Sequence, residues 1–281
     1  MSNLSALTQT VAAHVQFLDV RDLKVTLGNT LIVNDMSLSA HAGELLAIIG
    51  PSGSGKTTLL KAITGERPYL GSIQLGGCEV ASLSPETQAM IRGVLPQASH
   101  LSFPLTVSEV IGLGILDRRQ DRLSRAHRVA EALSLVGLPG FEARTYQDLS
   151  GGEQQRVQLA RVLCQVWDPV AEDGTPRWLF LDEPVSSLDI KHQYQIMKLA
   201  KDYARRGGGV IAVMHDLNLT AAFADKVLVM KNGSKVQHGS LEDVFSETTL
   251  TPTFEMPLAV TRDDENGIRV VPRFSADHSK S

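Results

Sequence analysis

The chain has 281 residues, of which 43% are hydrophobic and 21% charged, so it can bury a large core within one or two domains. Its 27 basic and 31 acidic residues give a formal net charge of −4, which argues against a protein that holds nucleic acid through its overall field. The longest apolar runs, Leu45–Ile49 and residues 210–214, are far shorter than the roughly 20 residues of a membrane span. We therefore expect no membrane span and no nucleic-acid partner.

The start of the chain and its cysteines favour a reduced, cytosolic protein. The first basic residue is Arg21, so the charged n-region of a secretory signal is not seen. Cys78 and Cys164 are the only cysteines and form no C-x-x-C pair, so we expect neither a disulfide framework nor a metal cluster. Residues 1–14 are small and polar, which predicts a flexible lead-in.

The predicted elements begin with two β-segments at residues 17–25 and 31–38, separated by the turn signal Gly28-Asn29, which we interpret as an antiparallel hairpin. The apolar run Leu45–Ile49 ends in a glycine-rich turn that opens a helix at Lys56–Ile63. Four more short apolar runs, each followed by a polar residue, predict strands buried on both faces of a mostly parallel sheet. They cover residues 93–96, 178–181, 210–214 and 227–230.

A helical subdomain is predicted between about residues 98 and 166. Within it, apolar residues at three- and four-residue spacing predict one buried stripe on a helix that Gly137 ends, formed by Leu123, Ala126, Val129, Ala130, Leu133 and Val136. We expect this subdomain to be inserted in an α/β domain over residues 15–260, followed by a C-terminal tail over residues 261–281.

A glycine-rich motif follows the first buried strand. Residues 50–57, GPSGSGKT, fit G-x-x-x-x-G-K-[ST] between a predicted strand and a predicted helix. The glycines allow backbone N–H groups to turn toward phosphate, and the helix start adds a positive dipole end. Lys56 would bridge the outer phosphates and the Thr57 hydroxyl would ligate magnesium; the alternative is a flexible glycine loop. The residues expected to hold the nucleotide here are Gly50, Pro51, Ser52, Gly53, Ser54, Gly55, Lys56, Thr57 and Thr58.

Two adjacent carboxylates, Asp182 and Glu183, follow the apolar residues 178–181. Open α/β sheets bind ligands at the carboxyl ends of such strands. Asp182 would hold magnesium through its water shell, and Glu183 would orient or deprotonate the attacking water. The structural alternative is a helix N-cap or a solvated turn, with which Pro184 is compatible.

A second candidate anion site lies in residues 149–156, LSGGEQQR. Ser150 and Glu153 form an S-x-x-E capping box that predicts a helix start. Gly151 and Gly152 leave bare N–H groups in the first turn, where a polyphosphate can approach. Two anion-binding helix starts in one chain indicate that the second serves a nucleotide held by another copy, which predicts a dimer.

Taken in order, these motifs resemble those of the ATP-binding cassette (ABC) family over nearly the whole chain. The matching elements are GPSGSGKT, Gln97, LSGGEQQR, LFLDEP, residues 187–189 and His215. The resemblance implies a P-loop NTPase fold with a mostly parallel core sheet, an N-terminal antiparallel β subdomain and the inserted helical subdomain. It also implies a head-to-tail dimer that binds ATP and Mg²⁺ between the phosphate loop of one subunit and the signature of the other.

The resemblance assigns roles to further residues. Gln97 would contact magnesium and the water, His215 the γ-phosphate, and Ser150 with Gly152 the γ-phosphate of the partner's ATP. Three positions depart from the family pattern: Glu153 replaces a frequent Gln, Leu27 stands where an aromatic residue usually stacks on adenine, and Val185 replaces a frequent Thr.

Two segments, residues 94–97 and 101–107, resemble the branch that imports iron siderophores, haem and cobalamin, and the flanks at 161–167, 173–178 and 191–193 resemble its haem import subunits. This implies an ATPase subunit at the cytoplasmic face of the inner membrane, bound to a separate permease dimer and served indirectly by a substrate-binding protein. Siderophore or cobalamin import, and a soluble cassette ATPase of translation or DNA repair, are the alternatives. A basic run is interpreted first as a solvated helix face, second as a permease or headgroup contact and third as a nucleic-acid contact: Arg118, Arg119, Arg122, Arg125 and Arg128.

Overall fold

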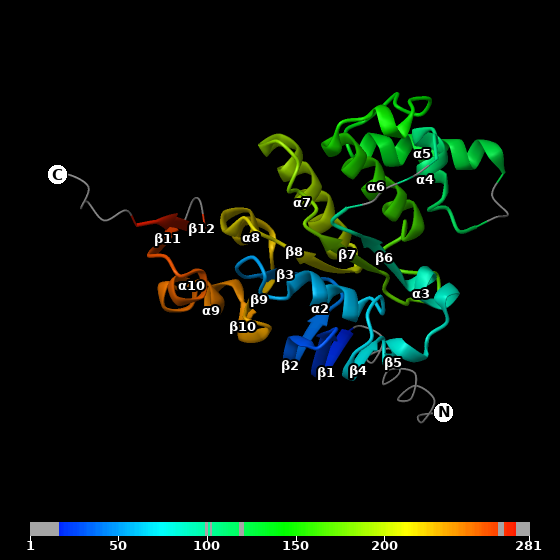
Figure 1. The fold of residues 1–281 in the computed structure, drawn as a ribbon. Helices are drawn as coiled ribbons and strands as arrows, with labels where there is room; N and C mark the ends of the chain where they lie inside the picture. Colours follow the sequence, from blue (N-terminus) through cyan, green and yellow to red (C-terminus); the bar gives the residue numbers. More distant parts are fainter. Residues whose placement is uncertain (1–16, 99–100, 102, 118–120, 264–266, 274–281) are drawn as a thin grey trace, which may run out of the picture.

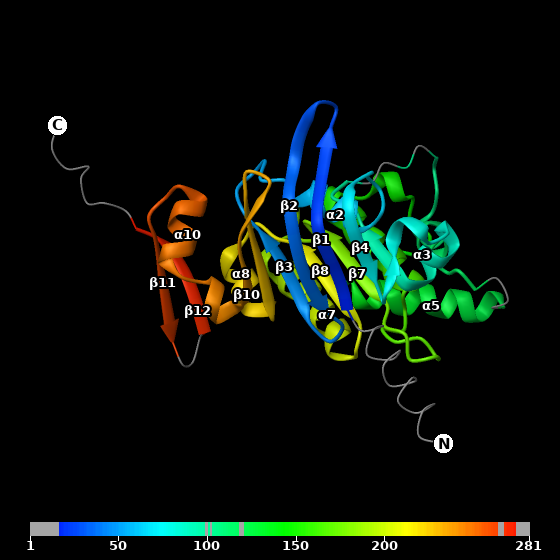
Figure 2. The ribbon, with the colours of Figure 1, turned by 90° about the horizontal axis from the view of Figure 1, so that it is seen from below.

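The computed structural model describes residues 17–98, 101, 103–117, 121–263 and 267–273 (Figure 1). The expected lead-in over residues 1–14 lies outside the described residues, as do Arg118 and Arg119 of the basic run. The described chain forms a central sheet with a second, smaller sheet on one face and helices on the other (Figures 1 and 2).

Six strands form the central sheet, in the order β10-β9-β3-β8-β7-β6. Only β10 is antiparallel to its neighbour, and the other four pairings are parallel. The prediction of a mostly parallel core sheet is therefore confirmed. In chain order the strands are β3 (Leu45–Ile49), β6 (Arg92–Leu95), β7 (Trp178–Asp182), β8 (Gly209–Val213), β9 (Lys226–Lys231) and β10 (Ser234–Ser240).

Both faces of this sheet are buried because its strands are continuously apolar. In β3, Leu46 and Ile48 pack in the cluster beneath the smaller sheet, whereas Leu45, Ala47 and Ile49 pack in the cluster beneath the helices. Successive side chains of a strand point to opposite faces, so a run without polar residues requires cover on both sides.

The smaller sheet is antiparallel, with strand order β2-β1-β4-β5. The predicted hairpin is confirmed: β1 (Phe17–Leu27) pairs with β2 (Thr30–His41) around Gly28. This hairpin lies across the strands of the central sheet, and helix α2 (Lys56–Ile63) packs between the two sheets (Figure 2). The remaining elements on this side are β4 (Leu70–Leu75), β5 (Cys78–Glu79), a 3₁₀ turn at Val80–Ser82 and α3 (Pro85–Ile91).

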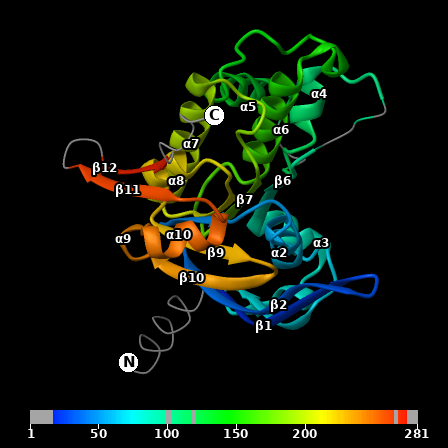
Figure 3. The same cartoon turned by 60° about the vertical axis from the view of Figure 1, so that its left-hand side comes forward.

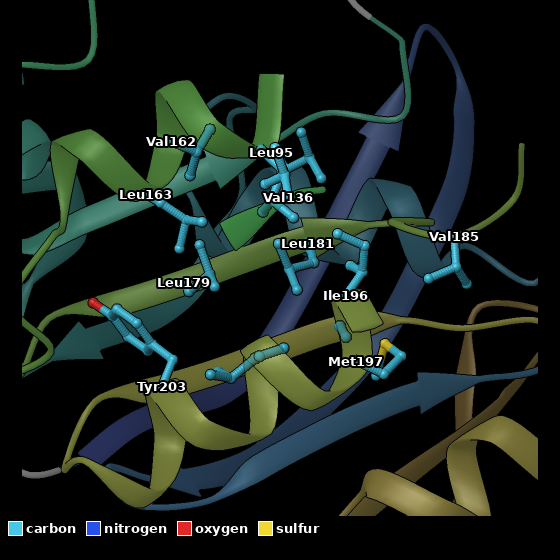
Figure 4. Packing of buried hydrophobic residues seen from close by; sticks show 14 of the residues in the cluster. Leu95, Val136, Val162, Leu163, Leu179, Leu181, Val185, Ile196, Met197 and Tyr203 are labelled. Atoms are coloured by element: carbon cyan, nitrogen blue, oxygen red, sulfur yellow. The ribbon is translucent and has the colours of Figure 1, made fainter. Parts of the chain in front are cut away.

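Helices cover the opposite face of the central sheet. Leu179 and Leu181 of β7 pack among Val162 of α6 and Ile196 and Met197 of α7 (Figure 4). This contact joins the inserted helical subdomain to the sheet. The helices on this side, with one 3₁₀ turn, are α4 (Val107–Gly112), α5 (Arg122–Leu135), Tyr146–Asp148, α6 (Gly151–Gln165), α7 (Ile190–Arg205) and α8 (Leu217–Phe223).

The buried apolar stripe of helix α5 is shorter than the sequence pattern predicted. Val129, Leu133 and Val136 are buried as expected, but Leu123 is 83% exposed and Ala126 and Ala130 are also exposed. Only the second half of α5 packs on the core, so the prediction of a continuous buried stripe was wrong. Periodicity alone does not tell how far the neighbouring helices extend.

The C-terminal segment packs against β9, β10 and α8. It consists of α9 (Leu241–Val244), α10 (Glu247–Phe254) and a hairpin of β11 (Leu258–Asp263) and β12 (Gly267–Pro272), which lies beside α8 (Figure 3). Asn218 of α8 donates from Nδ2 to Val270 O at 3.1 Å and accepts from Val270 N at 2.8 Å. Strand β11 thus crosses residue 260, where the sequence placed the end of the α/β domain.

Candidate active site

Three parallel strands align their carboxyl ends at one edge of the central sheet. Ile48 of β3 and Asp182 of β7 both pair with Val213 of β8. The residues that immediately follow these three positions therefore meet at this edge. They include the start of the phosphate loop, Glu183 and His215.

The phosphate loop, residues 50–57, needs glycine where the chain passes close to its neighbours. Gly50 has φ +152°, and a Cβ there would overlap the carbonyl oxygen of Met230. Gly55, the N-cap of α2, has φ +95°, and a Cβ would come within 3.0 Å of Ile32 O. Ser52 and Gly53 are exposed, whereas Ser54 is buried and Pro51 and Thr58 are half-buried. The loop thus requires glycine at residues 50 and 55, and Ser52 and Gly53 are its exposed part.

Lys56 lies folded into this loop. Its Nζ donates to Gly50 O at 2.9 Å and to Pro51 O at 3.0 Å, and the residue is buried. Burial lowers the pKa of Lys56, and the carboxylates of Glu183 and Asp182 counteract this shift in part. A desolvated ammonium beside a ring of backbone donors is a site for a polyanion.

Asp182 and Thr57 make the neighbouring oxygen site. Thr57 Oγ1 donates to Asp182 Oδ1 at 2.9 Å, while Asp182 Oδ2 is buried and has no hydrogen-bond partner among the described residues. Burial raises the pKa of Asp182, the Thr57 hydrogen bond lowers it, and the adjacent Glu183 raises it further. An orphaned carboxylate oxygen beside a hydroxyl fits the hard oxygen chemistry that Mg²⁺ prefers.

Glu183 is held at both its backbone and its side chain. Its φ is +52°, a conformation that non-glycine residues seldom adopt. Its Oε1 lies 2.6 Å from His215 Nε2 in a hydrogen bond, and its carbonyl accepts from Gln155 Nε2 at 2.8 Å. From the sequence we expected Glu183 to act on the attacking water and His215 on the γ-phosphate. The structure shows that the two side chains are hydrogen-bonded to each other.

The signature segment begins α6 with the predicted capping box, which is confirmed. Ser150 Oγ accepts from Glu153 N, and Glu153 Oε2 accepts from Ser150 N at 2.8 Å. Ser150 Oγ also donates to Glu153 Oε2 at 2.7 Å, and this bond together with the one from Ser150 N holds the pKa of Glu153 below its usual range. A Cβ at Gly151 would meet open space, but one at Gly152 would lie 2.9 Å from Ser187 O. Ser150 and Gly151 are exposed, so the start of α6 is accessible from outside the subunit.

A family profile described as ABC transporter matches residues 33–186. The chain belongs to the ABC transporter family. A protein named hemin import ATP-binding protein HmuV, from Rhizobium etli, is 52% identical over 262 residues, which cover 92% of this chain and 98% of that protein. The protein of the same name from a Jannaschia species is 55% identical over 243 residues, which cover 86% of this chain and 89% of that protein.

Solved ABC structures share the fold. The ATP-binding subunit of an ABC transporter matches with a TM-score of 0.71 at 23% identity, over 81% of this chain and 91% of that one. A dimeric ATP-binding cassette in a post-hydrolysis state, bound to ADP and Pi, matches with a TM-score of 0.69 at 28% identity, over 80% of this chain and 98% of that one. The ABC fold expected from the sequence is confirmed.

The remaining predicted residue of this ABC cassette, Gln97, follows β6 at the edge of the sheet. It is exposed and lines a pocket of ≈ 170 Å³ together with Gly151, Gln155 and Ser187. Gln155 was not among the residues predicted for the site, although the i, i+4 spacing from Gly151 to Gln155 placed both on one face of the predicted helix. No helix among the described residues has both the length and the apolar character required to cross a membrane.

Proposed function

We propose that the chain is the ATP-hydrolysing subunit of an ABC importer whose cargo is haem. The observation that carries the proposal is 52% identity over nearly the full length of a hemin import ATP-binding protein, in a chain that has the phosphate loop, Asp182 and Glu183 at one sheet edge. The hydrogen bonds that these side chains make within the chain would be exchanged for bonds to ATP, which supports hydrolysis of ATP by water to ADP and phosphate.

Binding of ATP would use the phosphate loop and α2. Lys56 Nζ now donates to two carbonyl oxygens of its own loop, and it would exchange them for phosphate oxygens, which are stronger acceptors because they are charged. Thr57, Asp182 and Gln97 would hold Mg²⁺, which when bound neutralises charge on the β- and γ-phosphates. The backbone N–H groups at the start of α2 would hold the remaining phosphate oxygens.

Hydrolysis would use the pair of Glu183 and His215. The Glu183 carboxylate lies within 2.6 Å of an imidazole nitrogen, so its orientation is set before the substrate arrives. It would take the proton of the attacking water, while His215 would donate to the γ-phosphate. Because both side chains follow strands of the central sheet, their separation is maintained by the ladder between β7 and β8.

The exposed start of α6 supports a head-to-tail dimer. Ser150 and Gly151 are accessible and lie on a helix different from the one that starts at the phosphate loop. Ser150 with Gly152 would contact the γ-phosphate of ATP held by the partner subunit.

A permease face would lie on the helical subdomain. Large apolar side chains are exposed between residues 103 and 123, namely Phe103, Leu113, Leu116 and Leu123. Such exposure is typical of an interaction surface. The chain would bind there a separate permease dimer at the cytoplasmic face of the inner membrane, and a substrate-binding protein would act only through that permease.

The test is growth of cells that lack this chain. We expect no growth on haem as sole iron source and normal use of ferric siderophores and free ferrous iron. Wild-type chain should restore growth, whereas Lys56→Ala and Glu183→Gln should not, although both proteins accumulate. Normal growth on haem combined with loss of siderophore or cobalamin uptake would assign the cargo to a sister importer, and no transport defect at all would favour a soluble ATPase.

A further inference from the structure

We propose that Gln155 is a positioning residue for hydrolysis, because its side-chain amide fixes the backbone of Glu183 to the helix that starts at Ser150. The inference rests on the proposed ATPase and adds a residue that links two parts of the site. Gln155 Nε2 donates to Glu183 O at 2.8 Å across 28 residues of sequence. Gln155 is half-buried, and a hydrogen bond shielded from water holds its partners more firmly than an exposed one.

The backbone of Glu183 needs such a restraint. Its φ of +52° is unfavourable for a side chain with a Cβ, and such a conformation persists only where surrounding contacts enforce it. Glu183 N donates to Val213 O at 3.2 Å, and Glu183 O accepts from Gln155 and, at 3.2 Å, from Ser186 Oγ. Ser186 is only three residues away and moves with the same turn. Gln155 is therefore the contact that ties this carbonyl to another element.

Because Gln155 lies on α6, its hydrogen bond connects the start of that helix to the backbone of Glu183. Gln155 lies one helical turn after Gly151, on the same face as the exposed helix start that would contact the partner's nucleotide. A shift of that helix start on nucleotide contact would move the Gln155 amide and with it the Glu183 carbonyl. Gln155 also lines the ≈ 170 Å³ pocket with Gln97 and Ser187, and its Oε1 is buried without a partner among the described residues.

Another glutamine on α6 makes similar bonds far from the site. Gln165 Nε2 donates to Ala89 O and Arg92 O, each at 2.9 Å, and is also half-buried. Both glutamines thus connect α6 to a neighbouring element through an amide donor. Neither acceptor belongs to a residue that would bind or hydrolyse ATP, which makes Gln165→Leu a matched control for Gln155→Leu.

The experiment measures kcat and KM for ATP in the purified full chain with magnesium, together with the melting temperature. We expect Gln155→Leu to lower kcat about tenfold while KM stays within about twofold, since one restraining hydrogen bond is lost and the phosphate loop is intact. Gln155→Glu keeps the length and polarity but cannot donate, so it should lose at least as much kcat. Gln165→Leu should lower the melting temperature and keep kcat within about twofold.

The outcomes separate this inference from the proposed function. A kcat within twofold of wild type in both Gln155 variants, or an equal loss of kcat in Gln165→Leu, would overturn the positioning role. If Gln155→Leu does not fold, Gln155→Glu alone decides. The ATPase activity on which the inference rests is measured in the same series, and it is refuted if the wild-type chain does not hydrolyse ATP.

Discussion

Two residues of the site, Lys56 and Asp182, are buried ionisable groups. Their burial costs free energy, and a bound ligand of opposite charge can reduce this cost. Lys56 is a buried cation satisfied only by carbonyl oxygens, and Asp182 is a buried carboxyl group with one oxygen unpaired. Burial of a charge is costly unless opposite charge compensates it. These two buried groups therefore contribute less to stability than the number of their polar contacts indicates.

We expect Lys56→Ala to lower nucleotide affinity about a hundredfold, because two charge-assisted hydrogen bonds to phosphate are worth roughly 3 kcal/mol together. The backbone donors of the loop would remain. Calorimetric titration with ATP and magnesium measures the loss, and Lys198→Ala, which removes an exposed ion pair on α7, is the control. Wild-type affinity in Lys56→Ala would contradict the phosphate-loop assignment.

Replacement of Glu183 by Gln separates binding from hydrolysis. The amide keeps the shape and an oxygen for His215 but cannot take a proton from water, so we expect kcat to fall by roughly 10²–10⁴ with ATP affinity unchanged. ATP should then hold the variant as a dimer, which gel filtration detects. A control is Glu172→Gln, which changes an exposed carboxylate in a loop. A monomer in ATP and magnesium would weigh against the shared site.

At the scale of elements, the N-terminal sheet is fastened at its edge by Glu79 of β5. Its carboxylate accepts from Tyr69 Oη at 2.9 Å, from Ser72 Oγ at 2.7 Å and from Ile73 N at 3.0 Å. Partial burial raises the pKa of Glu79, but these three hydrogen bonds outweigh it and hold the pKa below its usual value. The ionised form thus joins β5 to β4 and to the turn before it.

We expect Glu79→Gln to lower the free energy of unfolding by about 1 kcal/mol at neutral pH. Because the folded pKa is depressed, the ionised group stabilises the fold above its unfolded pKa of about 4.3, and this contribution disappears as the pH falls through the folded pKa. The difference between wild type and variant should therefore shrink below pH ~4. Urea unfolding across this range measures it, and a difference that grows toward acid pH would refute the assignment.

At the scale of the whole molecule, the two candidate anion-binding helix starts lie in different parts of the subunit. Helix α2 begins at the phosphate loop, while α6 begins with exposed residues on the helical subdomain. In the proposed dimer the start of α6 would contact the ATP of the partner subunit, so hydrolysis would require two copies.

Ser150→Arg should bind ATP with wild-type affinity and lose nearly all hydrolysis, because the added bulk and charge lie at the surface presented to the partner. A coupled assay of phosphate release measures the activity, and nucleotide titration shows that the subunit's own site is intact. Ser134→Arg, an exposed change on α5, should keep the activity. Full activity in Ser150→Arg would exclude a site shared across the dimer.

The sequence by itself determined five of the six strands of the central sheet, the limits of α2 and the position of the glycine-rich loop before it, whereas β10 was not predicted. These features depend on neighbouring residues: the apolar run Leu45–Ile49 requires burial on both faces, and Lys56–Ile63 follows a loop motif that ends in a helix. The capping box of Ser150 and Glu153 is equally local. Such signals are readable because the interacting groups lie within about one turn or one strand of each other.

Only the tertiary structure decided which residues separated in sequence restrain each other. It pairs Glu183 with His215, ties Glu183 O to Gln155, and places Ser187 O where Gly152 can have no side chain. It also exposes Leu123 on a helix whose period predicted burial. The physical reason is that these contacts depend on how strands and helices pack across the sheet, and a local pattern of apolar and polar residues does not specify the neighbour that a given face will meet.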